Sequence, residues 1–266
     1  MKRPPDQVLR EIERYLSLGY REIVLVGIHL GHYGKDLEMS LAALLSQIER
    51  AWQGASGKWR LRLGSIDPTD FTPQLMEGLF ASALLCNQLH IPLQSGSGKV
   101  LALMNRGYSP DDYAGLASML RKGRPGLALT TDLMVGFPGE TEVDFVETLN
   151  FLQAVGFSRV HIFPYSLREG TKAAGMKGHL PRRIKEERVK RAEQTAKVLA
   201  KAYRGLFLDQ VVEVLLEETN RDGYAEGFSR EYLRVQVKEE RRPNTLLHVK
   251  VVTAAREPLT GVVAPI

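Results

Sequence analysis

Cysteine is almost absent from this sequence: Cys86 is the single one among 266 residues. One thiol excludes an internal disulfide, and it excludes a zinc or iron–sulfur site built from the cysteines of this chain alone. Because Cys86 follows Leu84 and Leu85, we expect a small, buried, apolar side chain at this position and not a nucleophile.

Long apolar runs are absent as well. No stretch approaches the roughly 18 consecutive apolar residues of a membrane-spanning helix, and the opening residues Met1 to Pro5 contain no apolar signal core. We therefore expect no membrane partner and a cytoplasmic location. A hydrophobic content of 44% with 25% charged residues excludes a disordered chain, and nothing in the composition indicates an oligomeric state.

Positive charge is present but unevenly distributed. The formal net charge is +5 and the isoelectric point is near 9.3, which favours an anionic partner without identifying it. Residues 207–266 contain eight Lys or Arg and ten Asp or Glu, so their net charge is −2 and residues 1–206 carry the remaining +7. The basic charge therefore lies in the larger, first part of the chain.

Short apolar strands alternate with amphipathic helices over the first 164 residues. Strands are expected at 22–27, 60–65, 88–93, 127–135 and 158–164, and helices at 4–18, 41–52, 73–84, 98–121 and 141–155. This alternation is typical of βαβ units in an α/β fold. Five strands are too few for a closed eight-stranded barrel, so a partial parallel (β/α) barrel is expected. The first strand should be fully buried.

The pattern changes after the last of these strands. Residues 181–204 predict a long basic helix that begins at Pro181 and closes the first domain, residues 1–206. Residues 207–266 contain short strands between turns, expected at 211–216, 223–227, 232–237 and 247–252, which predict a small antiparallel β-barrel of a type that often binds oligonucleotides. We place the domain boundary near residue 206.

Polar, glycine-bearing loops follow all five expected strands, where ligands bind in parallel α/β folds. A phosphate loop is excluded at Gln94 to Gly98 because the G-x-x-x-x-G-K-[ST] pattern is missing. His29 and His32 lack a third ligand at suitable spacing, so we expect ordinary loop histidines and no metal site. Asp132, on an otherwise apolar strand, requires a partner such as a ligand hydroxyl or an arginine. The absence of a nucleophile–base pair argues against a cofactor-independent enzyme.

Taken in order, six blocks of the sequence resemble the catalytic barrel of the radical S-adenosylmethionine tRNA methylthiotransferases. The blocks read RPP, EIVLVGIHLGHYG, LRLGSIDPTDFT, HIPLQSGSGKVLALMNRGY, TTDLMVGFPGETEVDF and FPYSLREGT. Residues 207–266 are similar to the TRAM domain of that family, which binds RNA. The resemblance covers essentially the whole chain, and the HIPLQSGS, MVGFPGET and YSLREGT blocks are highly specific in combination.

The resemblance implies a barrel of the radical SAM type, with S-adenosylmethionine and [4Fe–4S] clusters as cofactors and tRNA as the partner. In the family, a cluster held by a C-x-x-x-C-x-x-C loop cleaves S-adenosylmethionine to a radical, which abstracts hydrogen from an adenosine next to the anticodon. A second cluster, in an upstream domain, supports sulfur insertion, and a second S-adenosylmethionine supplies the methyl group.

This sequence departs from the family pattern in one large respect. The C-x-x-x-C-x-x-C loop, which in the family lies a few residues before the R-P-P block, is missing, and so is the upstream cluster domain. We therefore expect an N-terminally truncated chain that contains no catalytic residue of its own for the radical step, binds no metal and is inactive alone.

The resemblance also assigns cofactor-binding residues to the loops. They are Gly27, His29, Gln94, Ser95, Ser97, Asp132, Gly136, Phe137, Pro138 and Gly139. The first two match a loop near the methionine end of S-adenosylmethionine. The glutamine and the serines match the loop beside that cofactor, and the aspartate with the turn after it flanks the ribose and adenine.

Candidate RNA contacts lie at the mouth of the barrel, on the closing helix and on the small barrel. They are Arg106, Arg168, Arg182, Arg183, Lys190, Arg191, Arg234, Lys238, Arg241 and Arg242. For Arg106 and Arg168 the alternative is a solvated or structural ion pair. Tyr224, Phe228 and Tyr232 are candidates for stacking on unpaired bases, and the alternative is that they fill the core of the small barrel.

The substrate branch follows from two blocks. The GIHLGHYG loop and the SIDP block are most like the branch that adds a 2-methylthio group to N6-threonylcarbamoyladenosine in tRNA. The isopentenyladenosine branch and the branch that modifies a ribosomal protein are the alternatives within the family. A non-catalytic RNA-binding remnant is the alternative of a different class.

Overall fold

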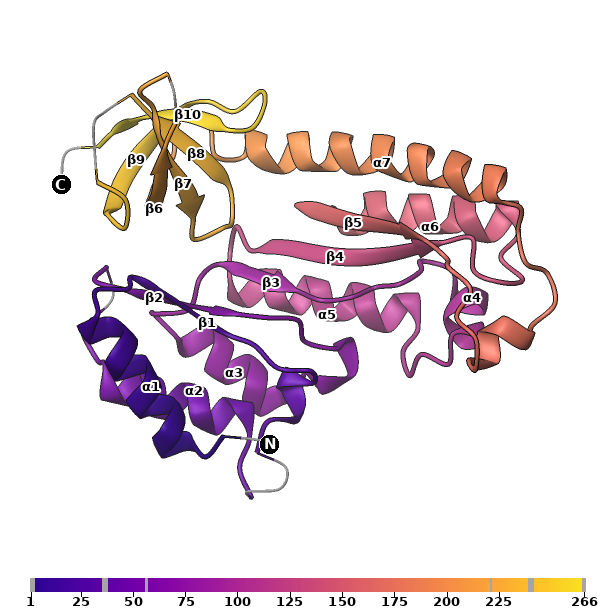
Figure 1. The fold of residues 1–266 in the computed structure, drawn as a ribbon, viewed down its shortest axis with the longest axis horizontal. Coiled ribbons are helices and arrows are strands. Elements are labelled where there is room, and N and C mark those ends of the chain that lie inside the picture. The colour runs from indigo at the N-terminus through magenta and orange to yellow at the C-terminus, as the bar shows by residue number, and fades with distance from the viewer. Residues whose placement is uncertain (1–2, 35–37, 56, 221, 239–241, 265–266) are drawn as a thin grey trace. The chain divides into compact units, whose positions relative to one another are not determined.

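The computed structural model describes residues 3–34, 38–55, 57–220, 222–238 and 242–264 (Figure 1). The chain divides into two compact units. The first unit contains residues 1–90, 123–128 and 204–266, and the second unit contains residues 91–122 and 129–203. Each unit therefore combines segments that are distant in the sequence.

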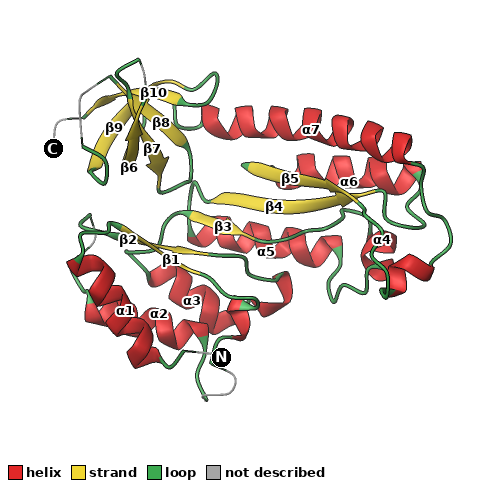
Figure 2. Ribbon diagram, viewed as in Figure 1, coloured by secondary structure: helices red, strands yellow, loops and turns green. Residues whose placement is uncertain are grey.

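The first unit opens with three helices and two paired strands. Its elements are α1 (Pro5–Ser17), β1 (Glu22–Leu25), η1 (Leu30–His32), α2 (Leu41–Ala51), β2 (Arg60–Leu63), η2 (Pro68–Asp70), α3 (Pro73–Ala81) and β3 (Gln88–His90). Strand β1 pairs with β2 in parallel, and α1, α2 and α3 lie on one side of this pair (Figure 2). Side-chain hydroxyls cap two of the helices, since Ser40 accepts from the N–H of Ala43 and Thr72 from that of Leu75.

A closed five-stranded barrel forms the rest of the first unit. Its strands are β6 (Val211–Thr219), β7 (Ala225–Ser229), β8 (Arg234–Val237), β9 (Leu246–Thr253) and β10 (Leu259–Val263), in the order β10-β8-β7-β6-β9. Four of the five pairings are antiparallel, whereas β10 and β8 pair in parallel. Gly227 lies at a register shift opposite Leu216, where the Cβ of any other residue would collide with the carbonyl of Leu215.

Buried arginines of β2 bind the small barrel within the first unit. Arg60, which is 0% exposed, donates to the carbonyl oxygen of Phe228 (2.9 Å), and its Nε donates to the carboxylate of Glu22 (2.6 Å). Arg62 donates to the same carboxylate (2.8 Å), and Arg230 of the barrel donates to the carbonyl oxygen of Leu85 (2.7 Å). Hydrogen bonds from buried charged side chains therefore connect residues 204–266 to residues 1–90.

The second unit contains the remaining helices and a parallel strand pair. Its elements are α4 (Gly98–Leu103), α5 (Pro110–Gly123), β4 (Ala128–Val135), α6 (Glu142–Val155), β5 (Arg159–Pro164), η3 (Lys172–Gly175) and α7 (Arg182–Gly205). The last residues of α5 and α7 and the first residue of β4 belong to the first unit. Strand β4 pairs with β5 in parallel. The segment before α4 runs alongside β4. The N–H of Ile91 donates to the carbonyl oxygen of Thr130, and that of Gln94 donates to the carbonyl oxygen of Asp132, each at 2.9 Å.

Helices of the second unit contact one another in chain order. Tyr113 of α5 packs edge-on against Phe151 of α6, with ring centroids 6.1 Å apart. Helix α6 contacts α7, where the guanidinium of Arg191 lies 4.8 Å from the ring centre of Phe145, and Figure 2 shows the two helices running side by side. Helix α6 begins at a capping box and ends at Gly156, which has a left-handed φ of 70°.

Most of the expected elements are confirmed. All five strands of the alternating region lie within the predicted ranges, as does the closing helix to within one residue. The predicted helical region at 98–121 consists of two helices, α4 and α5. The prediction that the first strand is fully buried is wrong: Val24 is 47% exposed, because β1 has only β2 as a strand neighbour among the described residues. Strand β10 was not predicted.

The domain boundary near residue 206 stays a prediction. None of the helices in the described ranges combines the length and the apolar character that crossing a membrane requires.

Candidate functional site

In the first unit, the loops that follow β1 and β2 contact each other through His32 and Asp70. His32 Nε2 lies 2.9 Å from Asp70 Oδ1, and the imidazole of His29 stacks on that of His32 with ring centres 5.3 Å apart. The Cβ of any other residue at Gly31 would collide with the side chain of Asp70, so the close approach requires glycine there. Asp70 is the partner that sequence reasoning did not assign. This pair favours a structural role for His32.

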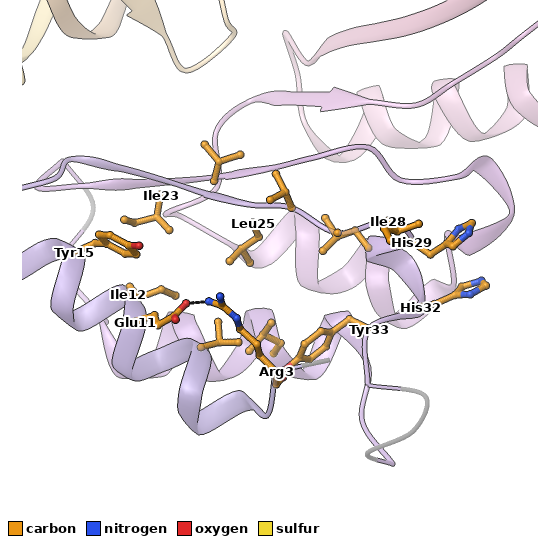
Figure 3. A pocket seen from close by; sticks show the side chains of 16 residues that line it. Arg3, Glu11, Ile12, Tyr15, Ile23, Leu25, Ile28, His29, His32 and Tyr33 are labelled. Atoms are coloured by element: carbon orange, nitrogen blue, oxygen red, sulfur yellow. Dashed lines mark hydrogen bonds and ion pairs between the residues drawn. The ribbon is translucent and has the colours of Figure 1, made fainter. Parts of the chain in front are cut away.

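A cavity of about 760 Å³ lies beside the first of these loops (Figure 3). Gly27 and His29 line it together with apolar side chains of α1 and β1, such as Ile12 and Ile23. Figure 3 shows the Arg3–Glu11 ion pair on its helical side and both histidines at one end. The two predicted cofactor-binding residues of the first unit thus lie on the wall of one cavity.

The residues of this chain do not fit an iron–sulfur cluster. Cys86 is 0% exposed, and burial, opposed in part by Arg62 and Arg60, raises the pKa of its thiol to about 11. The thiol is therefore protonated at neutral pH and is neither a nucleophile nor a ready ligand. Within the described ranges, no three His, Cys, Asp or Glu side chains are arranged to hold a metal ion.

In the second unit, the loop from Gln94 to Gly98 is held by α6. The hydroxyl of Ser95 lies 3.2 Å from that of Thr148, which also accepts from the N–H of Gly96 at 3.1 Å. The hydroxyl of Ser97 donates to Asp144 at 3.1 Å. Both serine side chains are buried, so they fix the loop against the helix, and the Gln94 side chain is half-buried.

Asp144 is the centre of this support, and sequence reasoning missed it. Its carboxylate accepts from Ser97, from Lys99 Nζ at 2.7 Å, and from the backbone N–H of Thr141 at 2.8 Å. Burial would raise the pKa of Asp144, but the hydrogen bonds from Lys99, Thr141 and Ser97 outweigh it and lower the pKa to about 2. A carboxylate that contacts the loop directly, from a position 47 residues after Ser97 in the sequence, therefore sets its shape.

The turn after β4 is part of the packed interior. The N–H of Gly136 donates to Glu140 at 3.0 Å, and Glu140 forms a buried ion pair with Arg188 of α7. Phe137 packs edge-on against Tyr165, with ring centres 5.4 Å apart. Pro138 is buried as well. The turn therefore positions the end of β4 and leaves little side-chain surface for a ligand. Gly139 lies beside it, and its N–H donates to the carbonyl oxygen of Gly178 at 3.1 Å.

A half-open face with both polar and apolar side chains remains at the carboxyl half of β4 and β5. Asp132 and Met134 project to the opposite face from Thr131, whose hydroxyl donates to Ile91 O at 2.7 Å. Asp132 lies opposite His161 in the strand register, and Met134 lies opposite a phenylalanine that is 51% exposed. The structure thus brings Gln94 and Asp132 together through the backbone bond between them. His161 belongs to the same face and was missed because a lone strand histidine carries no distinctive signal.

The candidate RNA contacts of α7 fall into two groups. Arg191 binds Glu142 at 2.6 Å, and Arg182 is paired with Glu186 one turn along the helix at the same distance. Arg183 and Lys190, by contrast, are exposed and form no ion pair with a described residue. Only part of the predicted basic helix therefore presents unpaired charge.

The remaining candidate contacts lie outside α7. Arg106 and Arg168 are exposed on loops of the second unit. On the small barrel, Arg234 binds Glu226 at 2.6 Å, while Lys238 and Arg242 are exposed. The prediction for Arg241 falls outside the described residues.

The aromatic residues of the small barrel are engaged within the first unit. Phe228 and Tyr232 stack on each other with ring centres 4.8 Å apart, and the guanidinium of Arg62 lies 4.8 Å from the ring centre of Tyr232. Tyr224 is half-buried. The first two rings therefore serve the contact between β2 and the barrel, which favours the structural alternative for them.

Comparison with known proteins gives a consistent result. The family model of the radical SAM superfamily matches residues 1–152. The chain is 39% identical over 258 residues to the threonylcarbamoyladenosine tRNA methylthiotransferase MtaB of Bacillus subtilis (strain 168), covering 95% of this chain and 56% of that protein. It is 39% identical over 217 residues to the tRNA-2-methylthio-N(6)-dimethylallyladenosine synthase of Moorella thermoacetica, covering 81% of this chain and 48% of that protein. The chain thus spans about half the length of these curated relatives.

Among solved structures, a radical S-adenosylmethionine methyltransferase from Kitasatospora setae, TsrM, has a similar fold. The TM-score is 0.50 at 16% sequence identity, and the match covers 61% of this chain and 31% of that one. That protein contains cobalamin and a [4Fe–4S] cluster. At this identity the likeness concerns the fold alone.

Proposed function

The chain belongs to the radical SAM superfamily, and from this premise we propose that it is the substrate- and cofactor-positioning part of a tRNA methylthiotransferase. The proposed reaction is 2-methylthiolation of N6-threonylcarbamoyladenosine next to the anticodon. The observation that carries this proposal is the 39% identity to the Bacillus subtilis threonylcarbamoyladenosine enzyme over 95% of this chain. The isopentenyladenosine branch is the second candidate, because the Moorella thermoacetica synthase is equally identical over 81% of the chain.

The superfamily uses S-adenosylmethionine and a [4Fe–4S] cluster. Since one buried cysteine is the whole thiol content of this chain, we propose that the 266 residues alone neither assemble a cluster nor cleave S-adenosylmethionine. Cluster ligands then have to come from residues outside this sequence. Purified chain supplied with iron and sulfide should stay colourless under reducing conditions.

The half-open face of the second unit is the proposed place for the nucleoside part of S-adenosylmethionine. Asp132 is suited to accept hydrogen bonds from ribose hydroxyls, and the amide of Gln94 can donate and accept beside it. Ser95 and Ser97 then act as positioning residues, because their hydroxyls hold the loop and not the ligand. Gly27 and His29 stay predicted cofactor contacts, and both line the cavity of the first unit.

Binding of tRNA is proposed for the small barrel and the basic helix. The five-stranded closed barrel supports a TRAM-like domain for residues 207–266, and residues 1–206 are proposed as the part of the radical SAM barrel with its closing helix. The barrel segment is net acidic, so it has to bind RNA through a local surface that includes Lys238 and Arg242. Arg106 and Arg168 are further candidates on exposed loops.

A chimera tests the proposal in cells. The part of the Bacillus subtilis relative that precedes the matched region is joined ahead of residue 1, and the fusion is expressed in a strain that lacks its own methylthiotransferases. Mass spectrometry of tRNA nucleosides should then detect 2-methylthio-N6-threonylcarbamoyladenosine. Exclusive formation of the isopentenyladenosine product would assign the second branch. Tight tRNA binding without either product, from a chimera that contains its clusters, would leave a non-catalytic RNA-binding protein.

A further inference from the structure

Helix α7 arranges four basic residues in one row. A helix turns about 100° and rises about 1.5 Å per residue, so positions seven apart return to almost the same side after about 10.5 Å. Arg183, Lys190 and Lys197 have this spacing, and Lys201 follows one turn later. All four side chains therefore lie within about 40° around the axis, along about 27 Å of helix. We call them the basic row.

The opposite side of α7 is the side that packs. Arg188, Ala192 and Tyr203 are its buried residues, and their positions lie roughly 140° to 200° around the axis from Arg183. The guanidinium of Arg188 is 4% exposed and pairs with Glu140. Packing therefore fixes the rotation of the helix, and the basic row faces away from the interior of the second unit.

Charges of the basic row are not neutralised within the unit. Arg183, Lys190, Lys197 and Lys201 are all exposed, and in the described part of the chain none of the four forms an ion pair with a carboxylate. The acidic residues nearest to the row belong to other pairs: Glu186 binds Arg182 at 2.6 Å, and Glu187 lies 3.9 Å from Arg191. The sequence pattern alone could not separate these two groups of basic residues.

We infer that the basic row binds the phosphate backbone of RNA, an inference that rests on the proposed tRNA partner. Three lysines and one arginine, at spacings of seven, seven and four residues, offer mobile cationic groups, which suit successive phosphates better than a shaped protein surface. The exposed apolar residue of this segment, Val198, lies about 60° from the row, so no aromatic or apolar anchor of a protein-binding hot spot interrupts it. The row therefore contributes affinity without base specificity, and Arg182 and Arg191 contribute little.

The test measures tRNA binding by the full chain as a function of salt. In the row variant, Lys190, Lys197 and Lys201 are replaced by glutamine. In the matched control, Lys58, Lys122 and Lys172 are replaced by glutamine; these lysines are also exposed but belong to other segments of the chain. Three lost phosphate contacts should flatten the slope of log Kd against log salt by about 2 and weaken binding at least about tenfold near 0.1 M salt. The control should change both quantities by less than half as much.

Each outcome has one reading. Equal effects of the row variant and the control would overturn the inference, because only net charge would then matter. Unchanged binding by the row variant, when the unmodified chain binds tRNA, would also overturn it and would leave the proposed function intact. Failure of the unmodified chain to bind tRNA contradicts the proposed partner itself. If vesicles containing anionic lipid, and not tRNA, bound in a row-dependent way, the row would be a membrane-surface site and the RNA inference would be wrong.

Discussion

Replacing Asp144 by asparagine should loosen the loop from Gln94 to Gly98 without removing any residue from it. The carboxylate accepts hydrogen bonds from Ser97, Lys99 and the N–H of Thr141. An asparagine keeps one acceptor oxygen and places an NH₂ donor where the second oxygen accepted. The hydroxyl of Thr141 donates to the same carboxylate, and at least one of these four donors then loses its partner in a side chain that is only 7% exposed.

The magnitude follows from these contacts. Loss of the helix-capping interaction with Thr141 costs about 0.5–2 kcal/mol. A buried Ser97 hydroxyl without a partner costs about 1–3 kcal/mol, whereas the pair with Lys99, a side chain that is 53% exposed, contributes at most about 1 kcal/mol. Because these terms overlap, we expect a total loss of about 2–4 kcal/mol in the free energy of unfolding.

Urea unfolding of the purified chain at pH 7, followed by circular dichroism, measures this loss. Asp112→Asn is the matched control, because Asp112 forms the same type of reciprocal bond with Ser109 at the start of α5 but is fully exposed. The control should shift the urea midpoint only slightly. If Asp144→Asn shifted the urea midpoint as little as the control does, the structural role assigned to Asp144 would be refuted.

The pH dependence provides a second check. The folded pKa of Asp144, about 2, is below its ordinary value of 3.8, so ionised Asp144 stabilises the fold above the ordinary value. This stabilisation disappears as the pH falls from about 4 toward 2. The stability difference between the unmodified chain and Asp144→Asn should therefore shrink on acidification. A difference that grew below pH 4 would contradict the assignment.

Three further changes test other parts of the structure. Arg60→Met removes one partner of the buried pair with Glu22 and should cost about 3–5 kcal/mol in urea unfolding, and a loss below 1 kcal/mol would show that the pair is dispensable. Gly96→Ala places a methyl group 2.8 Å from a backbone atom of α6 and should cost about 1–3 kcal/mol, whereas Gly115→Ala, with open space around it in α5, should be neutral or stabilising. Cys86, whose pKa is raised to about 11 by burial, should react with iodoacetamide at pH 8 far more slowly in the folded chain than in urea, and equal rates would disprove its burial.

The alternation of strands and helices could be predicted because it depends on local patterns. Residues 128–135 form the expected strand since branched and apolar residues dominate them, and α6 begins where Thr141 can cap it. The exposure of β1 could not be predicted, because it depends on which strands lie beside it. Strand β10 was missed because Gly261 interrupts a short run, although it closes the barrel by parallel pairing with β8.

In the candidate site, too, local features could be predicted from the sequence and long-range contacts could not. The loop residues Ser95 and Ser97 could be found from the sequence, but not the direction of their hydroxyls, which depends on Asp144 some fifty residues away. Arg60 and Arg62 alternate on one strand, as expected for one face, yet their barrel partners lie about 150 residues later in the chain. Contacts of this range carry no local signal.

We propose that the half-open face with Asp132 positions the cofactor for methylthiolation of tRNA. The yield of 2-methylthio-N6-threonylcarbamoyladenosine from the chimera carrying Asp132→Asn tests it most directly, with Asp112→Asn as the exposed control. We expect the first variant to lose at least about tenfold in yield, equivalent to about 1.4 kcal/mol, while its tRNA affinity stays unchanged, and we expect the control to keep full yield. An Asp132→Asn chimera that modified tRNA as well as the control would contradict the account.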